Sequence, residues 1–249
     1  MSLKENKQDW EDLSNLDLLW AIFADPKKQF GGWNEEEFFS SGEDEINKIL
    51  DKVKRLGDPS KFHLALDFGC GVGRLTRGLA KNFELCYGVD ISEVMINKAN
   101  NYNQSIKNCK FILNTENKLP MFSDNYFDLI YSSIVLQHIP KKKDIESYIQ
   151  EFIRILKKDG ILIFQLPSYV PLLYRIQPKT KLYHLFRSIG IGKKFLYHTL
   201  KLYPFVINFL SESQVKSILI KQNANLLESF LDNKAGKSIQ SRTYFVTKN

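Results

Sequence analysis

A glycine-rich bend between an apolar stretch and an amphipathic helix constrains this chain more than any other feature. Residues 64–75 read LALDFGCGVGRL, so a buried strand leads through three closely spaced glycines into a helix with Leu75, Leu79 and Phe83 on one face. A Cβ at these glycines would block the tight turn or the close approach of a ligand, and the helix start presents free N–H groups. The segment therefore predicts a ligand-binding loop between a strand and a helix.

Two acids near this loop indicate which ligand it accepts. Dinucleotide-binding folds place G-x-G-x-x-G here, but Thr76 stands where the third glycine would be. Asp67, two residues before the first glycine, would repel a pyrophosphate and suit a ligand that carries an ammonium and a sulfonium. Asp90 ends an apolar strand about twenty residues further on, where a carboxylate can accept both hydroxyls of a ribose. Two alternatives remain: Asp67 as a structural residue of a tight turn, and Asp90 as a helix cap.

Short apolar runs alternate with longer helical ones from residue 63 onward, which is typical of strand-helix units in a mostly parallel sheet. We expect strands near 63–68, 84–90, 110–113, 127–132 and 160–166, and two more near 226–231 and 242–247. The helix before the fifth strand should be stopped by Asp159-Gly160. Asn34 and Ser211 are expected to cap two other helices.

In this order, the loop and the acids resemble the class I S-adenosylmethionine-dependent methyltransferases, in particular the small-molecule group with the pattern D-x-G-C-G-x-G-R. The resemblance runs from about Phe62 to Leu166. It implies an α/β, Rossmann-like, doubly wound seven-stranded sheet with strand order 3-2-1-4-5-7-6 and helices on both faces. It also implies S-adenosyl-L-methionine as the cofactor and S-adenosyl-L-homocysteine as its product.

The same resemblance implies a set of cofactor-binding residues. The loop would line the methionine half, Asp90 would bind the ribose, and Met95 would pack on the adenine. The third family segment aligns with residues 114–122, NTENKLPMF, where Thr115 replaces the expected acid, so three neighbouring residues are candidates for the adenine contact. The full expected set is Asp67, Gly69, Cys70, Gly71, Gly73, Asp90, Ile91, Met95, Asn114, Thr115, Glu116 and Ser132, with no metal ligand.

The residues after the fourth strand bear on the reaction. Ser132 to Val135 stand where a segment of the Asn-Pro-Pro-Tyr type would grip a planar amine, and no cysteine lies there for covalent attack on a pyrimidine. We therefore expect methyl transfer to an O or N atom of a small-molecule acceptor. His138 could act as a base toward a hydroxyl, or could instead pack near the cofactor or cap the loop. Alternatives are an RNA- or lipid-associated methyltransferase and a cofactor-binding partner protein without transfer.

Residues 168–210 carry seven basic residues, nine Tyr and Phe residues and no acid. We expect one methyltransferase domain over 61–249, preceded by a helical segment over 1–60, with 168–210 inserted after the fifth strand as a lid that selects an anionic or aromatic acceptor. The alternative is a helical surface packed on the sheet. No separate RNA-binding module is visible, which argues against nucleic acid. A peripheral membrane contact is a weaker alternative, through the apolar residues Phe186, Phe195, Leu196, Leu200 and Phe205.

Three cysteines without a CxxC pair indicate neither a disulfide framework nor a zinc site. The first residues lack the apolar core of a signal peptide, and no run reaches the roughly 18 apolar residues of a membrane span. These features predict a cytoplasmic protein.

Overall fold

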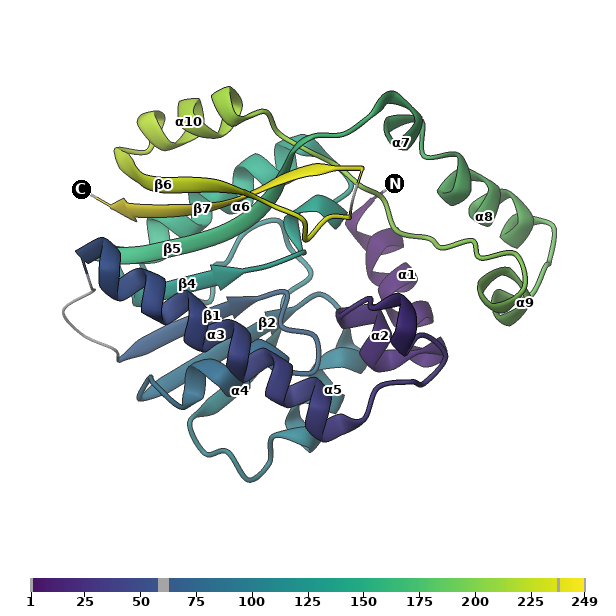
Figure 1. Cartoon of the computed structure of the whole chain (residues 1–249), viewed down its shortest axis with the longest axis horizontal. Helices are drawn as coiled ribbons and strands as arrows, with labels where there is room; N and C mark the ends of the chain where they lie inside the picture. Colours follow the sequence, from purple (N-terminus) through teal and green to yellow (C-terminus); the bar gives the residue numbers. More distant parts are fainter. Residues whose placement is uncertain (1, 58–62, 237, 249) are drawn as a thin grey trace.

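Seven strands form one sheet in the order β3-β2-β1-β4-β5-β7-β6 in the computed structural model, which describes residues 2–57, 63–236 and 238–248 (Figure 1). Neighbouring strands among the first five run parallel, and β7 is antiparallel to both β5 and β6. The fold and strand order predicted from the resemblance are confirmed. The strands are β1 (Leu64–Phe68), β2 (Leu85–Asp90), β3 (Cys109–Leu113), β4 (Phe127–Ser132), β5 (Leu156–Tyr169), β6 (Ala224–Asp232) and β7 (Gln240–Lys248).

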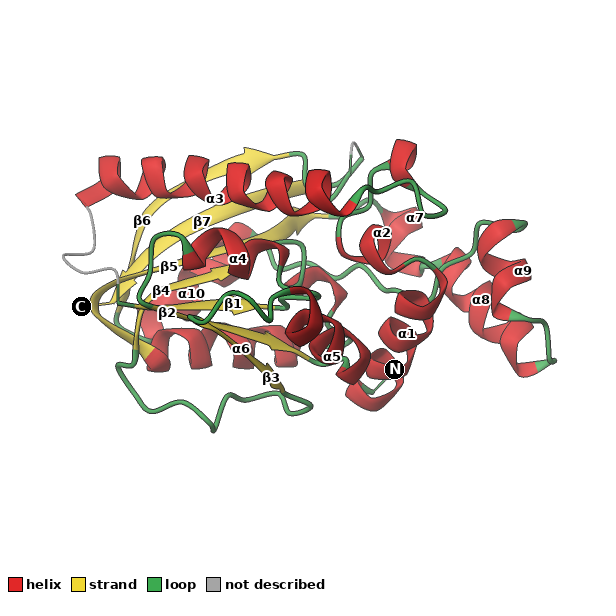
Figure 2. Cartoon of the chain, turned by 90° about the horizontal axis from the view of Figure 1, so that it is seen from below, coloured by secondary structure: helices red, strands yellow, loops and turns green. Residues whose placement is uncertain are grey.

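Helices cover both faces of this sheet (Figure 2). The helices α3 (Glu35–Gly57) and α4 (Arg74–Ala80) pack on one face through residues such as Ile46 and Leu79. On the other face lie α6 (Lys142–Ile155) and α10 (Glu212–Lys221), with Phe152 and Val215 in the core. Because β1 to β4 run parallel, their carboxyl ends lie at one edge of the sheet, which is where parallel sheets bind their ligands.

The caps of two helices agree with the sequence, and the end of a third helix does not. Ser211 forms the predicted capping box with Gln214, and the side chain of Asn34 accepts from the amides at the start of α3. The predicted stop at Asp159-Gly160 is wrong, because α6 already ends at Ile155. Asp159 instead adopts φ 62° inside β5, where the pairing with β4 shifts register, so the two residues form an irregularity in the strand.

The N-terminal helices and the insertion pack against each other. The N-terminal helices are α1 (Leu3–Leu16), α2 (Leu18–Ile22) and a short 3-10 turn at Pro26–Lys28, and α5 (Glu93–Tyr102) lies near them. The insertion holds α7 (Leu172–Ile176), α8 (Pro178–Ser188) and α9 (Lys193–His198), which stand away from the sheet in Figures 1 and 2. The Tyr197 hydroxyl donates to Asp17 at 2.9 Å, and Lys193 pairs with Asp12. No helix in the described part of the chain is long and apolar enough to cross a membrane.

The close crossing of α3 and α4 generates a stability prediction. A Cβ at Gly42 would lie 2.3 Å from the backbone oxygen of Arg74, so Gly42→Ala must push the helices apart. We expect the free energy of unfolding to fall by about 1–3 kcal/mol in chemical denaturation. The control is Gly192→Ala, where the added Cβ meets nothing within 4 Å. Equal stability of the two variants would contradict the close crossing.

Candidate functional site

A cavity of about 590 Å³ lies at the carboxyl edge of the sheet, a size usual for small-molecule sites. It is lined by Gly69 and Gly71 after β1, Asp90 at the end of β2, Asn114 after β3 and Ser133 after β4. Four neighbouring strands thus each contribute to one wall. The sequence predicted the first four of these residues, and the structure brings them together.

Two positions of the glycine loop, Gly69 and Gly71, accept only a residue without a side chain. Gly69 and Gly71 have φ values of 77° and 54°, and a Cβ would lie 2.3 Å from Val135 at the first and 2.8 Å from Ile22 at the second. Cys70 also lines the cavity, and burial together with the nearby Asp90 carboxylate raises the pKa of its thiol well above the usual range. A thiol with a raised pKa is a poor nucleophile, so Cys70 is best described as a small side chain within the loop.

Asp90 ties the loop to the end of β2. Its Oδ2 accepts from the Gly71 amide and its Oδ1 from the Ser92 amide, both at 2.9 Å. Burial raises the pKa of Asp90, and these amide bonds act in the opposite direction. The cap of α5 is Ser92, whose hydroxyl accepts from the Met95 amide, so Asp90 does not serve as the cap. A carboxylate has about four lone-pair sites, so Asp90 can accept further bonds from a ligand.

Asn114 is the one of the three adenine candidates that lines the cavity. Thr115 and Glu116 are exposed side chains outside its wall. The Nδ2 of Asn114 donates to the carbonyls of Glu116 and Lys118 at 3.0 and 3.1 Å. Both amide hydrogens are therefore used, and Oδ1 is the side-chain atom that can accept from a ligand. Ile91 and Met95 also line the cavity.

Asp67 lies behind the loop and not at the cavity wall, contrary to the expectation. It is 1% exposed, and the Thr76 hydroxyl donates to its Oδ2 at 2.6 Å. Burial raises the pKa of Asp67 to about 7, against the effects of Thr76 and Arg74. Because side chains alternate along a strand, Asp67 faces α4 while its neighbours Leu66 and Phe68 pack in the core on the opposite face. The predicted repulsion between Asp67 and a pyrophosphate therefore has no direct basis in the structure.

Gly73 and Ser132 are also outside the cavity wall. A Cβ at Gly73 would meet Asn103 and Phe111 at 2.8 Å, so this glycine faces α5 and β3. Ser132 is fully buried, and the next residue, Ser133, lines the cavity instead. The difference of one position is what side-chain alternation at the end of a strand produces.

A charged cluster at the β4 end of the cavity was not predicted. Glu45 of α3 accepts from Lys234 at 2.5 Å, from Arg74 at 2.7 Å and from the Tyr131 hydroxyl at 2.7 Å. Burial favours the protonated acid, but the two cations outweigh it and hold the pKa of Glu45 down at about 2. Arg74 is the last residue of the D-x-G-C-G-x-G-R pattern, so this pattern offered a reason to include it among the expected site residues. Glu45 and Lys234 lie far away in the sequence, in segments without a motif.

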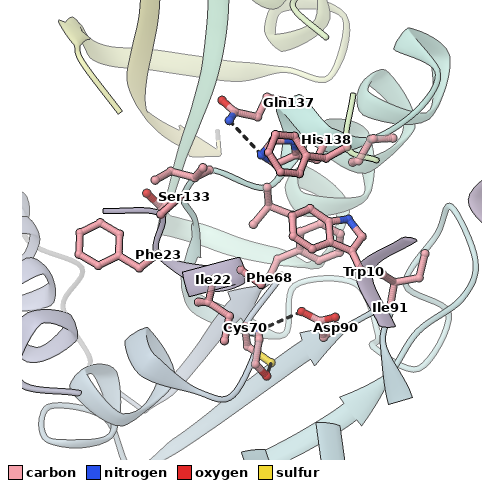
Figure 3. A pocket seen from close by; sticks show the side chains of 18 of the residues that line it. Trp10, Ile22, Phe23, Phe68, Cys70, Asp90, Ile91, Ser133, Gln137 and His138 are labelled. Atoms are coloured by element: carbon pink, nitrogen blue, oxygen red, sulfur yellow. Dashed lines mark hydrogen bonds between the residues drawn. The ribbon is translucent and has the colours of Figure 1, made fainter. Parts of the chain in front are cut away.

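The cavity is covered by the N-terminal helices more than by the insertion. Figure 3 shows Ile22 beside Cys70 and Trp10 beside Asp90, and Phe23 lines the cavity further away, on the side of Ser133. The insertion supplies only Phe205 and Ile207 from its returning segment. None of its seven cations, all within the described residues, lines the wall. The insertion that was expected to form a lid therefore lies beside the cavity, and its basic residues do not line the wall.

His138 lies at the cavity wall on a short 3-10 turn (Leu136–His138), yet both nitrogens of its ring contact protein groups. Its Nδ1 is 2.8 Å from the Val206 carbonyl and its Nε2 is 3.1 Å from the Gln137 amide nitrogen. The first contact requires Nδ1–H to donate, which leaves Nε2 to accept from Gln137. Burial lowers the pKa of His138 to about 4. Trp10 and Phe205 each pack edge-on to the ring at 5.3 Å, which favours the packing role.

The part of the chain that contains the glycine loop and strands β1 to β5 is similar to known proteins. Residues 66–164 match the family model of a methyltransferase domain. The uncharacterized methyltransferase YcgJ of Bacillus subtilis is 28% identical over 130 residues, which are 51% of this chain and 48% of that protein. Human mitochondrial arginine-hydroxylase NDUFAF5 is 33% identical over 118 residues, 47% of this chain and 32% of the relative. The chain spans about half or less of the length of these curated relatives.

A solved structure extends the likeness to the whole fold. Magnesium protoporphyrin IX methyltransferase from Synechocystis, with bound S-adenosylhomocysteine, superposes with a TM-score of 0.63 over 99% of both chains at 17% identity. At that identity the likeness concerns the fold alone. S-adenosylmethionine is the cofactor of this family. Residues 66–164 of the chain therefore form a domain of the class I S-adenosylmethionine-dependent methyltransferase family.

Proposed function

We propose that the chain binds S-adenosylmethionine in this cavity and transfers its methyl group to an O or N atom of a small-molecule acceptor. The observation that carries the proposal is the placement of Asp90, the Gly69–Gly71 bend and Asn114 on one wall, at the ends of neighbouring strands. Asp90 would accept from the ribose hydroxyls, Asn114 Oδ1 from the adenine amino group, and the bend would hold the methionine half. Ile91 and Met95 would flank the adenine.

The chain's contribution to the chemistry is alignment. The bound cofactor supplies an activated methyl group on a sulfonium together with its own leaving group. Positioning of two reactants can lower a barrier by about 7–11 kcal/mol in favourable cases. With both ring nitrogens engaged and a pKa of about 4, His138 fits a wall residue better than a base.

The cavity wall also suggests the acceptor. Beyond the cofactor residues, much of the lining is aromatic or aliphatic, including Trp10, Trp20, Phe205 and Ile207. The two lining cations, Arg74 and Lys234, both contact Glu45. We therefore propose an acceptor with an apolar or ring-shaped body, and a polar end directed to the Glu45 cluster. The relatives' names cover different chemistry, which makes a direct assay of transfer necessary.

Replacement of Asp90 tests the cofactor site. We expect Asp90→Asn to weaken S-adenosylhomocysteine binding by roughly ten- to a hundredfold in calorimetry, because one to two charge-assisted hydrogen bonds are lost. The control is Asp51→Asn, an acid whose side chain is 72% exposed on α3. Circular dichroism should show that both variants are folded. Equal affinities of the two variants, or no binding by the original chain, would count against the proposal.

Methyl transfer itself can be measured with labelled cofactor. The chain, incubated with methyl-labelled S-adenosylmethionine and a small-molecule extract, should yield one new labelled product in mass spectrometry and an equal amount of S-adenosylhomocysteine. Cofactor binding without any labelled product would instead indicate a partner protein. A product that gains oxygen and no label would point to hydroxylation.

The role of His138 can be tested by titration. Because burial holds the folded pKa near 4, below the unperturbed value of about 6.5, the ring should stay neutral down to about pH 5 in NMR spectra. The signal is assigned by its loss in His138→Asn. The sign follows from linkage: the unfolded chain binds a proton between about pH 6.5 and 4 that the folded chain does not, so this residue lowers stability as the pH falls through that window. A midpoint near 6.5 would restore His138 as a candidate base.

A further inference from the structure

The insertion, residues 168–210, forms a lobe of the molecule that leaves a large apolar surface exposed. Ten of the sixteen exposed large hydrophobic side chains among the described residues lie between 169 and 200. On α7, Leu172 and Leu173 are 69% and 66% exposed. Single exposed hydrophobic residues are normal, but such a concentration marks an interaction surface.

The helix α8 carries a strip of this surface. Leu182, Leu185 and Ile189 are 42%, 55% and 67% exposed, and their spacing of three and four residues places them on one side of the helix. On another side, Tyr183 is buried with Leu196 in the lobe's own small core. The helix is therefore apolar on two sides, and the exposed strip is not needed to hold the lobe together.

Positive charge surrounds the strip. Lys179 precedes Leu182 by three residues and Lys181 precedes Leu185 by four, so at helical spacing the two lysines lie along its edges. Both lysines are exposed, and neither forms an ion pair with a carboxylate in the described part of the chain. No Asp or Glu occurs anywhere in 168–210. A partner of uniform negative charge fits this surface better than a protein of mixed charge.

We propose that α7 and α8 form a docking surface for an anionic lipid membrane. The lobe stands away from the sheet (Figure 2), so its exposed apolar strip can lie in the interface while the flanking lysines meet the headgroups. None of these side chains lines the cavity, so the surface is independent of the proposed methyl transfer.

The surface differs from the membrane face that the sequence suggested. Of the five residues expected there, Leu196 is buried and Phe186 and Phe205 are partly buried, while Phe195 and Leu200 are exposed. The lobe is connected to the cavity, because the segment that returns from it contributes Phe205 and Ile207 to the wall. A membrane-docked lobe would thus place the cavity near a source of apolar molecules.

Vesicle binding tests the proposal with the full chain. We expect cosedimentation with phosphatidylcholine vesicles that contain phosphatidylglycerol, weaker binding at high salt, and little binding to pure phosphatidylcholine. Replacement of Leu182, Leu185 and Ile189 by Gln should weaken binding at least tenfold. Lys179→Gln with Lys181→Gln should weaken it about 25-fold, about fivefold for each cation.

The matched control replaces exposed hydrophobic residues elsewhere. Ile220, Leu227 and Leu231 are 77%, 40% and 59% exposed on α10 and β6, and their replacement by Gln should leave vesicle binding unchanged. Thermal unfolding of all variants checks that the fold is intact. Equal loss in the control, equal binding to neutral vesicles, or no vesicle binding would overturn the proposal. If no vesicle binding is found, a change of oligomeric state on replacement of Leu182, Leu185 and Ile189 would indicate that a second copy of the chain occupies the surface. Salt-sensitive binding to single-stranded RNA would instead indicate a nucleic acid.

Discussion

The carboxylate of Asp90 is the group on which the site depends. Its two oxygens accept from the amides of Gly71 and Ser92, both at 2.9 Å, so it fixes the bend after β1 and the start of α5 at the same time. The same carboxylate lines the cavity. The shape of the loop and the place where a ribose would be held are therefore set by one side chain. Its burial raises its pKa, and the amide donors help to keep the charged form.

The rest of the cavity is arranged around this point. The strand order places β3 and β2 on one side of the glycine bend and β4 on the other. One end therefore has Asn114 and Asp90, and the other has the Glu45 cluster with Lys234 and Ser133. The helices α1 and α2 add Trp10 and Trp20 to the cavity wall, and the insertion supports these helices through pairs such as Lys193 with Asp12.

Local sequence patterns predicted the strands and the glycine loop, and the resemblance to the methyltransferases implied the strand order and the cavity-lining residues at the strand ends. They failed where the answer depends on side-chain direction or on distant segments. Asp67 and Ser132 belong to the right strands, but alternation turns them away from the cavity. Glu45 and Lys234 come from a long helix and a hairpin far apart in the chain, and nothing in their local sequence shows that they meet. The cover of the cavity was also assigned wrongly, to residues 168–210. Aromatic and basic composition does not reveal that this segment packs against the N-terminal helices and that these helices line the cavity.

The most direct test is a crystal structure of the chain with S-adenosylhomocysteine. We expect density in the cavity, with the two ribose hydroxyls within hydrogen-bond distance of the Asp90 carboxylate and the adenine between Ile91 and Met95. Ligand bound elsewhere, or in the cavity without contact to Asp90, would contradict the proposed role of Asp90.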